Sequence, residues 1–498
     1  MNHPLRLVLA GLFCVVGCGS SGSGSTTGSG GAFATGGAIG SGGKSAAGGI
    51  SGSGGTAANG GATGAGGASQ GGGGLSRGGA GGNGGAAGRG GATGSGGSEA
   101  TGGTTGACVP TVPTITWTNP YVGWSRGIPT ATDPTFFPIA VWLQGSWHAT
   151  EMGQLGINIY VGNNAGTDPL AASDLATLKA QGIYAIIGQD SVGLANIDDP
   201  TIVGWWASPD EPDNAQAKSD GSCCDPPIAP ATMISNYNAY KSADPTRPIY
   251  LGLGQGVAYD GWEGRGSNAP PESGYMPAGD IVDFDIYPYN NCDGDANEQV
   301  TCGQFWLNAY GIDRIHQWST RGQAAWTDIE TTTINKGGTH PPTPQETRSE
   351  VWLSLIHGAN GIAYFVDTWN PSFREDGIFA DATMISAVTA LNKQIKMLAP
   401  QLNSANIPNL VSVGSSNTAA PIDMMVKAKG QTLYVFAAIS RAGTATGSFT
   451  VAGMSGGGVG TVAGESRTVT IAAGRFSDAF AANDVHIYQI DLTTATCP

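Results

Sequence analysis

Between residues 136 and 400 the sequence alternates short apolar runs with longer stretches that have helical periodicity. The apolar runs have the length of strands and cover residues 136–143, 157–161, 184–189, 202–206, 248–253, 281–287, 323–330 and 361–366. Apolar residues recur every three or four positions in residues 172–181, 233–242, 305–319, 344–357 and 385–398. Strands that alternate with helices form parallel βαβ units, so eight such units predict an α/β fold, a closed (β/α)8 TIM barrel. An open doubly wound sheet is the competing fold, but no GxGxxG follows the first strand.

The pattern changes after residue 402. Short alternating runs at 424–427, 432–439, 447–451, 466–471 and 485–490 are separated by glycine-rich turns. This pattern predicts a small antiparallel β-sandwich. We therefore place the barrel at residues 108–402 and the sandwich, with a structural role, at residues 403–498.

The first 107 residues are expected to lie outside the folded part. Arg6 precedes an apolar run at residues 7–16 that is far shorter than the ~20 residues a membrane-spanning helix needs. Residues 1–17 therefore predict a signal peptide for export. Residues 15–18, VVGC, resemble a bacterial lipobox, which implies a lipid on Cys18; cleavage at another site is the alternative. Gly19 after this cysteine resembles an outer-membrane sorting signal, so we expect a lipid-anchored protein at the outer membrane or cell surface.

Residues 18–107 are almost wholly Gly, Ser, Ala and Thr, which predicts a disordered linker with a reach of about 50 Å. The net charge of −15 argues against a nucleic-acid partner. An exported chain favours disulfides, and the cysteines outside the signal region are Cys108, Cys223, Cys224, Cys292, Cys302 and Cys497. Cys292 and Cys302 share one polar loop and are the first predicted pair; the other pairings and the oligomeric state stay open. No metal is expected, because no ligands with zinc spacing lie near these cysteines, and no cofactor is expected.

Two glutamates follow predicted strands at the end where barrel enzymes place their catalytic groups. Glu211 follows the fourth strand in the sequence WWASPDEP, and Glu330 follows the seventh in WTDIET. Retaining glycoside hydrolysis needs two carboxyl groups about 5–5.5 Å apart, one to protonate the leaving oxygen and one to attack the anomeric carbon. Asp328 shares a strand face with Glu330 and is expected to point inward as well. A serine hydrolase is disfavoured because the chain lacks a GxSxG motif.

These motifs resemble glycoside hydrolase clan A, the (β/α)8-barrel retaining glycosidases, over about residues 136–400. The resemblance implies that Glu211 is the acid/base and Glu330 the nucleophile. It also implies that Tyr287, after the sixth strand, bonds to the nucleophile, and that Trp369, after the eighth, forms a sugar platform. Trp142 and Trp262 are further candidates for stacking on sugars, as are Trp147 and Trp205. The expected partner is therefore a carbohydrate substrate, cleaved without a cofactor.

Asp210 departs from the clan pattern, in which an asparagine precedes the acid. An aspartate can still bind the 2-hydroxyl of the sugar, and its charge is expected to raise the pKa of Glu211. The Asp210-Glu211 pair also leaves open a substrate-assisted N-acetylhexosaminidase, in which Glu330 only binds substrate. A non-catalytic carbohydrate-binding lipoprotein is the other alternative, which the retention of both glutamates disfavours. The sugar, the linkage, endo or exo action, and hydrolysis or transglycosylation stay open.

Overall fold

The structure is a computed structural model that describes residues 108–162, 171–218, 224–266, 269–335 and 337–498. The predicted signal peptide, the predicted lipidation site Cys18 and the predicted linker at 18–107 lie outside the described residues. Among the helices of the described part, none is long and apolar enough to cross a membrane.

Nine parallel strands form one sheet with the order β7-β6-β5-β4-β3-β2-β1-β9-β8. Their bounds are β1 Ile139–Trp142, β2 Ile159–Val161, β3 Tyr184–Gly188, β4 Ile202–Trp206, β5 Ile249–Leu253, β6 Ile281–Phe284, β7 Ala324–Ala325, β8 Asp328–Glu330 and β9 Ile362–Phe365. The short strands β7 and β8 are two parts of one run. Trp326 N donates to Val282 O at 2.9 Å, and Ala363 N donates to Thr327 O at 3.1 Å. This run joins both ends of the sheet and closes the ring, so the predicted eight-stranded barrel is confirmed, with its seventh strand interrupted.

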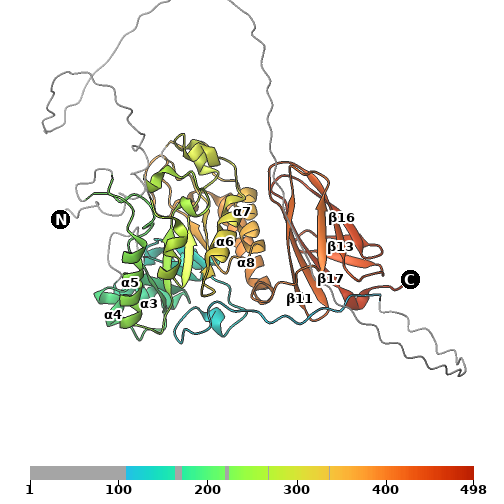
Figure 1. Ribbon diagram of the computed structural model, residues 1–498, viewed down its shortest axis with the longest axis horizontal. Coiled ribbons are helices and arrows are strands. Elements are labelled where there is room, and N and C mark those ends of the chain that lie inside the picture. Colours follow the sequence, from blue (N-terminus) through green and yellow to red (C-terminus); the bar gives the residue numbers. More distant parts are fainter. Residues whose placement is uncertain (1–107, 163–170, 219–223, 267–268, 336) are drawn as a thin grey trace, which may run out of the picture. The chain divides into compact units, whose positions relative to one another are not determined.

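Helices flank these strands, as Figure 1 shows for α3 to α8. Those of the described residues are α2 Ala149–Leu155, α3 Ala172–Ala180, α4 Ser191–Ala195, α5 Pro230–Ala243, α6 Leu307–Trp318, α7 Pro344–Ile356 and α8 Ala382–Leu402. The five predicted helices are present, and α2 and α4 are additional. Helix α7 begins with a capping box, in which Thr343 and Glu346 bind each other's backbone amides.

The barrel strands bury both faces, as all-parallel sheets do. Residues such as Ile139 and Val141 face outward onto the helices, whereas Ala140 and Trp142 face inward with Trp326. Towards the carboxyl ends of β6 and β8 the inward positions become acidic.

After α8 the chain forms two antiparallel sheets, drawn in orange and red in Figure 1, with the orders β10-β13-β16 and β11-β12-β17-β14-β15. The bounds are β10 Val411–Ser415, β11 Ile422–Lys429, β12 Thr432–Ile439, β13 Ala445–Val451, β14 Gly458–Val462, β15 Arg467–Ile471, β16 Arg475–Phe480 and β17 Val485–Asp491. The antiparallel sandwich is thus confirmed, with β10, β14 and β16 added. A disulfide joins Cys108 to Cys497, and Trp352 of α7 stacks on Phe436 of β12 with ring centroids 5.7 Å apart.

Candidate active site

Glu211 lies in the loop after β4 with a φ of 43°, in the left-handed region. This conformation costs a residue other than glycine about 1 kcal/mol, and such strain often occurs at functional sites. Two glycines of the β5 region make room for the acidic side chains beside it. A Cβ atom on Gly254 would lie 2.9 Å from Glu211 Oε1, and one on Gly252 would lie 2.5 Å from Asp210 Oδ1. The glycines therefore allow both carboxyl groups to lie directly on the strand backbone.

A small cavity opens beside Glu211 at the carboxyl ends of β4, β5 and β6. Amide, acidic and aromatic side chains line it: Glu211, Asn214, Gln255, Trp262, Asp285, Tyr287, Asn290, Asn291, Glu298, Ile334 and Asn335. Trp262 Nε1 donates to Asn214 Oδ1 at 2.8 Å, and Asn214 in turn hydrogen-bonds to Glu211. Of the predicted site residues, the structure brings Glu211, Trp262 and Tyr287 together on this cavity wall. Planar rings and amides are the side chains that a sugar-binding site needs.

Carboxyl groups gather at the cavity and below it. We call these groups the acidic cluster: Asp210, Glu211, Asp213, Asp283, Asp285 and Asp328. The Tyr250 hydroxyl donates a hydrogen bond to Asp283 Oδ2 at 2.7 Å. None of the ion pairs found among the described residues includes a member of this cluster. The described residues also contain no group of three or more His, Cys, Asp or Glu that could hold a metal ion.

Burial raises the pKa of every carboxyl group in the acidic cluster. The pKa of Asp213 rises to about 8 and that of Asp283 to about 7. The pKa of Glu211 is also raised by burial, against hydrogen bonds with Asp285 and Asn214 that lower it. Some of these groups therefore hold protons at neutral pH, as a general acid must.

Asp210 has a pKa well above its usual range, first because it is buried and then because Glu211 and Asp283 are close. We expected the charge of Asp210 to raise the pKa of Glu211. In the structure burial is the main cause at Glu211, and charge repulsion acts on Asp210.

Glu330, at the end of β8, is fully buried, with 0% of its surface exposed. Its Oε1 accepts a hydrogen bond from Tyr289 N at 2.8 Å, and its Oε2 accepts two from Asn290, from N at 2.9 Å and from Nδ2 at 2.6 Å. Glu350 of α7 is equally buried and hydrogen-bonds to Glu330. Burial, and then the charge of Glu330, hold the pKa of Glu350 well above its usual range. A protonated Glu350 would donate a hydrogen bond to the Glu330 carboxylate, and this bond lowers the pKa of Glu330 against the effect of burial.

Asn290 separates Glu330 from the cavity. The residue lines the cavity, and its side chain donates to both Glu330 and Thr332 O and accepts from Ile334 N at 2.7 Å. No hydrogen bond joins Tyr287 to Glu330 among the described residues. Tyr287 instead hydrogen-bonds to Asp328, and this bond lowers the pKa of Asp328, which burial raises. The structure therefore brings Asp210, Glu211, Tyr287 and Asp328 together and places Glu330 one side chain behind the cavity wall.

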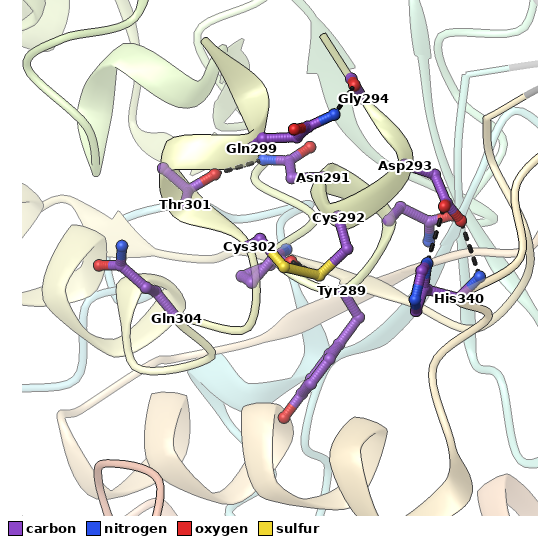
Figure 2. Close-up of a disulfide and its surroundings, with 12 residues drawn as sticks. Tyr289, Asn291, Cys292, Asp293, Gly294, Gln299, Thr301, Cys302, Gln304 and His340 are labelled. Atoms are coloured by element: carbon purple, nitrogen blue, oxygen red, sulfur yellow. Dashed lines mark hydrogen bonds and ion pairs between the residues drawn. A yellow bond between two sulfur atoms is a disulfide. The ribbon is translucent and has the colours of Figure 1, made fainter. Parts of the chain in front are cut away.

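After β6 the chain forms a loop closed by a disulfide, and Asn291 lies directly before this disulfide (Figure 2). Asn290 precedes Asn291, and Glu298 lies inside the closed loop; all three line the cavity. The predicted disulfide between Cys292 and Cys302 is present. Asn291 Nδ2 donates to Thr301 Oγ1 at 2.7 Å within this loop and to Gln255 Oε1 at 2.9 Å outside it. Such bonds hold the amides in place. The sequence analysis did not single out these asparagines; the cysteine pair in a polar loop after a strand was the signal that could have found them.

The other predicted aromatic residues lie elsewhere on the barrel. Trp142, at the end of β1, is buried and packs edge to face on Trp206 at 5.2 Å. Trp369 follows β9 and stacks on Phe365 at 5.8 Å. Trp205 faces outward and donates to Asp244 at 2.9 Å, so it belongs to the helix-facing core.

A search of known protein families finds no match, and neither does a search of curated proteins. Among solved structures the chain is similar to one described as a glycoside hydrolase, with a TM-score of 0.48, 12% identity, and 74% of this chain and 98% of that chain covered. It is also similar to a family 30 endoxylanase from Clostridium papyrosolvens C71, with a TM-score of 0.40, 12% identity, and coverage of 72% and 96%. A third is a family 5 glycoside hydrolase from Bacteroides vulgatus, with a TM-score of 0.39, 10% identity, and coverage of 72% and 89%. Function has to be derived from the site itself.

Proposed function

We propose that this chain is a retaining glycoside hydrolase that cleaves an O-glycosidic bond in a polysaccharide or oligosaccharide. The observation that carries the proposal is the position of Glu211, a carboxyl group of raised pKa on the wall of a cavity lined by amides and aromatic rings. A proton donor of this kind is what the departing glycosidic oxygen requires.

In the proposed reaction Glu211 gives its proton to the leaving oxygen while a second carboxylate attacks the anomeric carbon. The carbon–oxygen bond breaks, the aglycone leaves as an alcohol, and a glycosyl ester forms on the enzyme. Water, deprotonated by Glu211, then attacks the same carbon and releases the sugar with its original configuration. Both carboxyl groups return to their starting protonation states.

We assign the second carboxylate to Glu330. Burial raises the pKa of Glu330, whereas the hydrogen bonds from Tyr289, Glu350 and Asn290 lower it and so favour its carboxylate form. Attack on the sugar then requires the Asn290 side chain to move aside, because it lies between Glu330 and the cavity. Catalytic hydrogen bonds commonly rearrange when substrate binds.

Asp328 is the alternative nucleophile, and one observation favours it. It lies on β8 within electrostatic reach of Glu211 and Asp210 and hydrogen-bonds to Tyr287. Its Oδ1 atom is buried and has no hydrogen-bond donor among the described residues. If Asp328 attacks, Glu330 has a structural role.

The substrate-assisted mechanism remains a second candidate because Asp210 lies directly beside Glu211 over Gly252. Asp210→Asn distinguishes the two mechanisms. An N-acetylhexosaminidase should lose nearly all turnover and should act on 2-acetamido sugars alone. A two-carboxylate enzyme should keep substantial turnover on plain hexosides, because the asparagine amide has the same shape as the Asp210 carboxyl group and can still hydrogen-bond to the 2-hydroxyl.

The test of the proposed function is turnover of a panel of glucans, mannans, galactans and xylans by the purified full chain. Glu211→Gln should reduce turnover more than ~10²-fold. Glu263→Gln, the same change at an exposed glutamate of the neighbouring 3-10 turn, should not. Failure of the wild type on every glycan, with glycan binding retained, would favour the non-catalytic carbohydrate-binding alternative.

We further propose that the chain is exported and anchored by a lipid on Cys18, with residues 18–107 as a tether. The support is the sequence of residues 1–19. The wild type should partition with membranes and Cys18→Ser should not. Wild-type protein found free in the medium without lipid would contradict the anchor.

A further inference from the structure

Two large aromatic side chains are exposed at the carboxyl ends of β1 and β9, which are neighbours in the barrel. Trp147, in the turn after β1, is 58% exposed, and Phe373, in the loop after β9, is 40% exposed. Exposed aromatic residues that gather in one place commonly mark a binding surface.

Phe373 is held in position by a short hairpin. Thr368 N donates to Arg374 O at 3.0 Å, and Arg374 N donates to Thr368 O at 2.8 Å. The closed hairpin places the ring of Phe373 5.2 Å from the ring of Trp369. The position of Phe373 is therefore fixed by the backbone.

Trp147 is held in position by its contact with Gly145. A Cβ atom on Gly145 would lie 2.3 Å from the indole ring, so the ring lies flat over this glycine. The two loops are also tied together. Gly145 N and Gln144 Nε2 both donate to Glu375, two residues after Phe373, and Gln144 donates to Asp367 at 2.8 Å. Trp147 and Phe373 thus stand on one connected rim.

The rim continues into the wall of the cavity. Trp369 N donates to Thr333 O at 3.3 Å, and Asn370 Nδ2 donates to Gly338 O at 2.9 Å. The segment between these two acceptors carries Ile334 and Asn335, which line the cavity beside Glu211. The loop that carries Phe373 is therefore hydrogen-bonded to the segment that lines the cavity.

The two loops that carry these rings also hold two buried polar side chains. Gln144 is fully buried, and its Oε1 has no donor among the described residues. Asp367 is also buried, beside the Gln144 amide. The exposed rings themselves suit a pyranose, which presents an apolar face that packs on an aromatic ring.

We propose that Trp147 and Phe373, with Trp369 behind them, form an outer subsite that binds a sugar residue beyond the one being cleaved. The substrate is then a glycan chain and not a disaccharide. This inference rests on the proposed function, because it names the substrate class of the same site.

Two measurements test it. The first compares KM for a polymer with KM for an aryl monoglycoside of the same sugar. Trp147→Ala and Phe373→Ala should each raise KM for the polymer about 10-fold more than KM for the monoglycoside, because only the polymer reaches the rim. Gly145→Ala should act in the same direction by displacing the Trp147 ring. Tyr310→Ala, at an equally exposed ring on α6, should leave the ratio unchanged.

The second measurement does not depend on turnover. Affinity electrophoresis in gels that contain soluble glucan, mannan, galactan or xylan should retard Glu211→Gln protein, and the added Trp147→Ala and Phe373→Ala changes should abolish the retardation. An unchanged KM ratio together with unchanged retardation would overturn the outer subsite. Absence of turnover in the wild type, with retardation that depends on the two rings, would instead overturn the hydrolase and keep the glycan-binding rim.

Discussion

Gly254→Ala tests whether the acid is held where the structure places it. The added Cβ would lie 2.9 Å from Glu211 Oε1 and 2.6 Å from Asn214 Nδ2, whereas ordinary contacts begin at 3.4 Å. Both side chains must therefore move by about 0.5 Å or more. Gly254 has φ −86° and ψ −172°, which alanine adopts without strain. The displaced atoms are ends of flexible side chains, so the fold should lose less than about 1 kcal/mol.

Activity should respond much more strongly than stability. A displacement of about 1 Å can cost ~10²-fold in rate, so we expect kcat/KM to fall about 10- to 100-fold on an aryl glycoside. Gly414→Ala is the matched control, because that glycine lies in β10 with no atom within 4 Å of its added Cβ. If Gly254→Ala kept kcat/KM within about 2-fold and an unchanged melting temperature, the placement of Glu211 as the acid would be refuted.

Two other predictions concern pH. Glu350→Leu removes a hydrogen bond to Glu330 that is worth about 1.5–3 kcal/mol, so the acidic limb of the pH profile of kcat/KM should move to higher pH by about 1–2 units. Glu350→Gln keeps a donor and should move this limb less. Equal pH profiles for the wild type and Glu350→Leu would contradict the role of Glu350. His357 is the other case: burial lowers its pKa, but hydrogen bonds with Asp313 and Asp423 outweigh this and raise it to about 9. A raised pKa stabilises the fold at pH values below the unfolded pKa of ~6.5, and this stabilisation is lost as the pH rises through about 9. His357→Gln should therefore lack a pH-dependent contribution of about 1 kcal/mol to the free energy of unfolding. Denaturation at pH 6 and pH 10 measures it, and the same pH dependence in both proteins would contradict it.

The barrel could be predicted because its signals are local. Each buried strand is a short apolar run in the sequence. Glu211 and Glu330 could be predicted because the end of such a run marks the end of a strand. The interruption of the seventh strand at Trp326 could not, since it depends on pairing with strands distant in the sequence.

The surroundings of Glu330 could not be predicted for a similar reason. Glu350 is a charged residue of helix α7, and a charged helix residue is expected to be exposed, yet it is fully buried against Glu330. Asn290 lies in an irregular loop whose path is set by the Cys292–Cys302 disulfide and by bonds to the segment after β8. Burial and loop position arise from tertiary packing, which periodicity does not report.

In the proposed mechanism Glu211 acts as the acid and a carboxylate of the seventh strand acts as the nucleophile. Azide trapping with an activated aryl glycoside tests it most directly, because azide replaces whichever carboxylate has been removed. Glu330→Gly should be rescued and yield the glycosyl azide of inverted configuration, Glu211→Ala should yield the retained one, and Asp328→Gly should yield none. An inverted azide from Asp328→Gly alone would move the nucleophile to Asp328. No glycosyl azide from any of the three would contradict the retaining two-carboxylate mechanism.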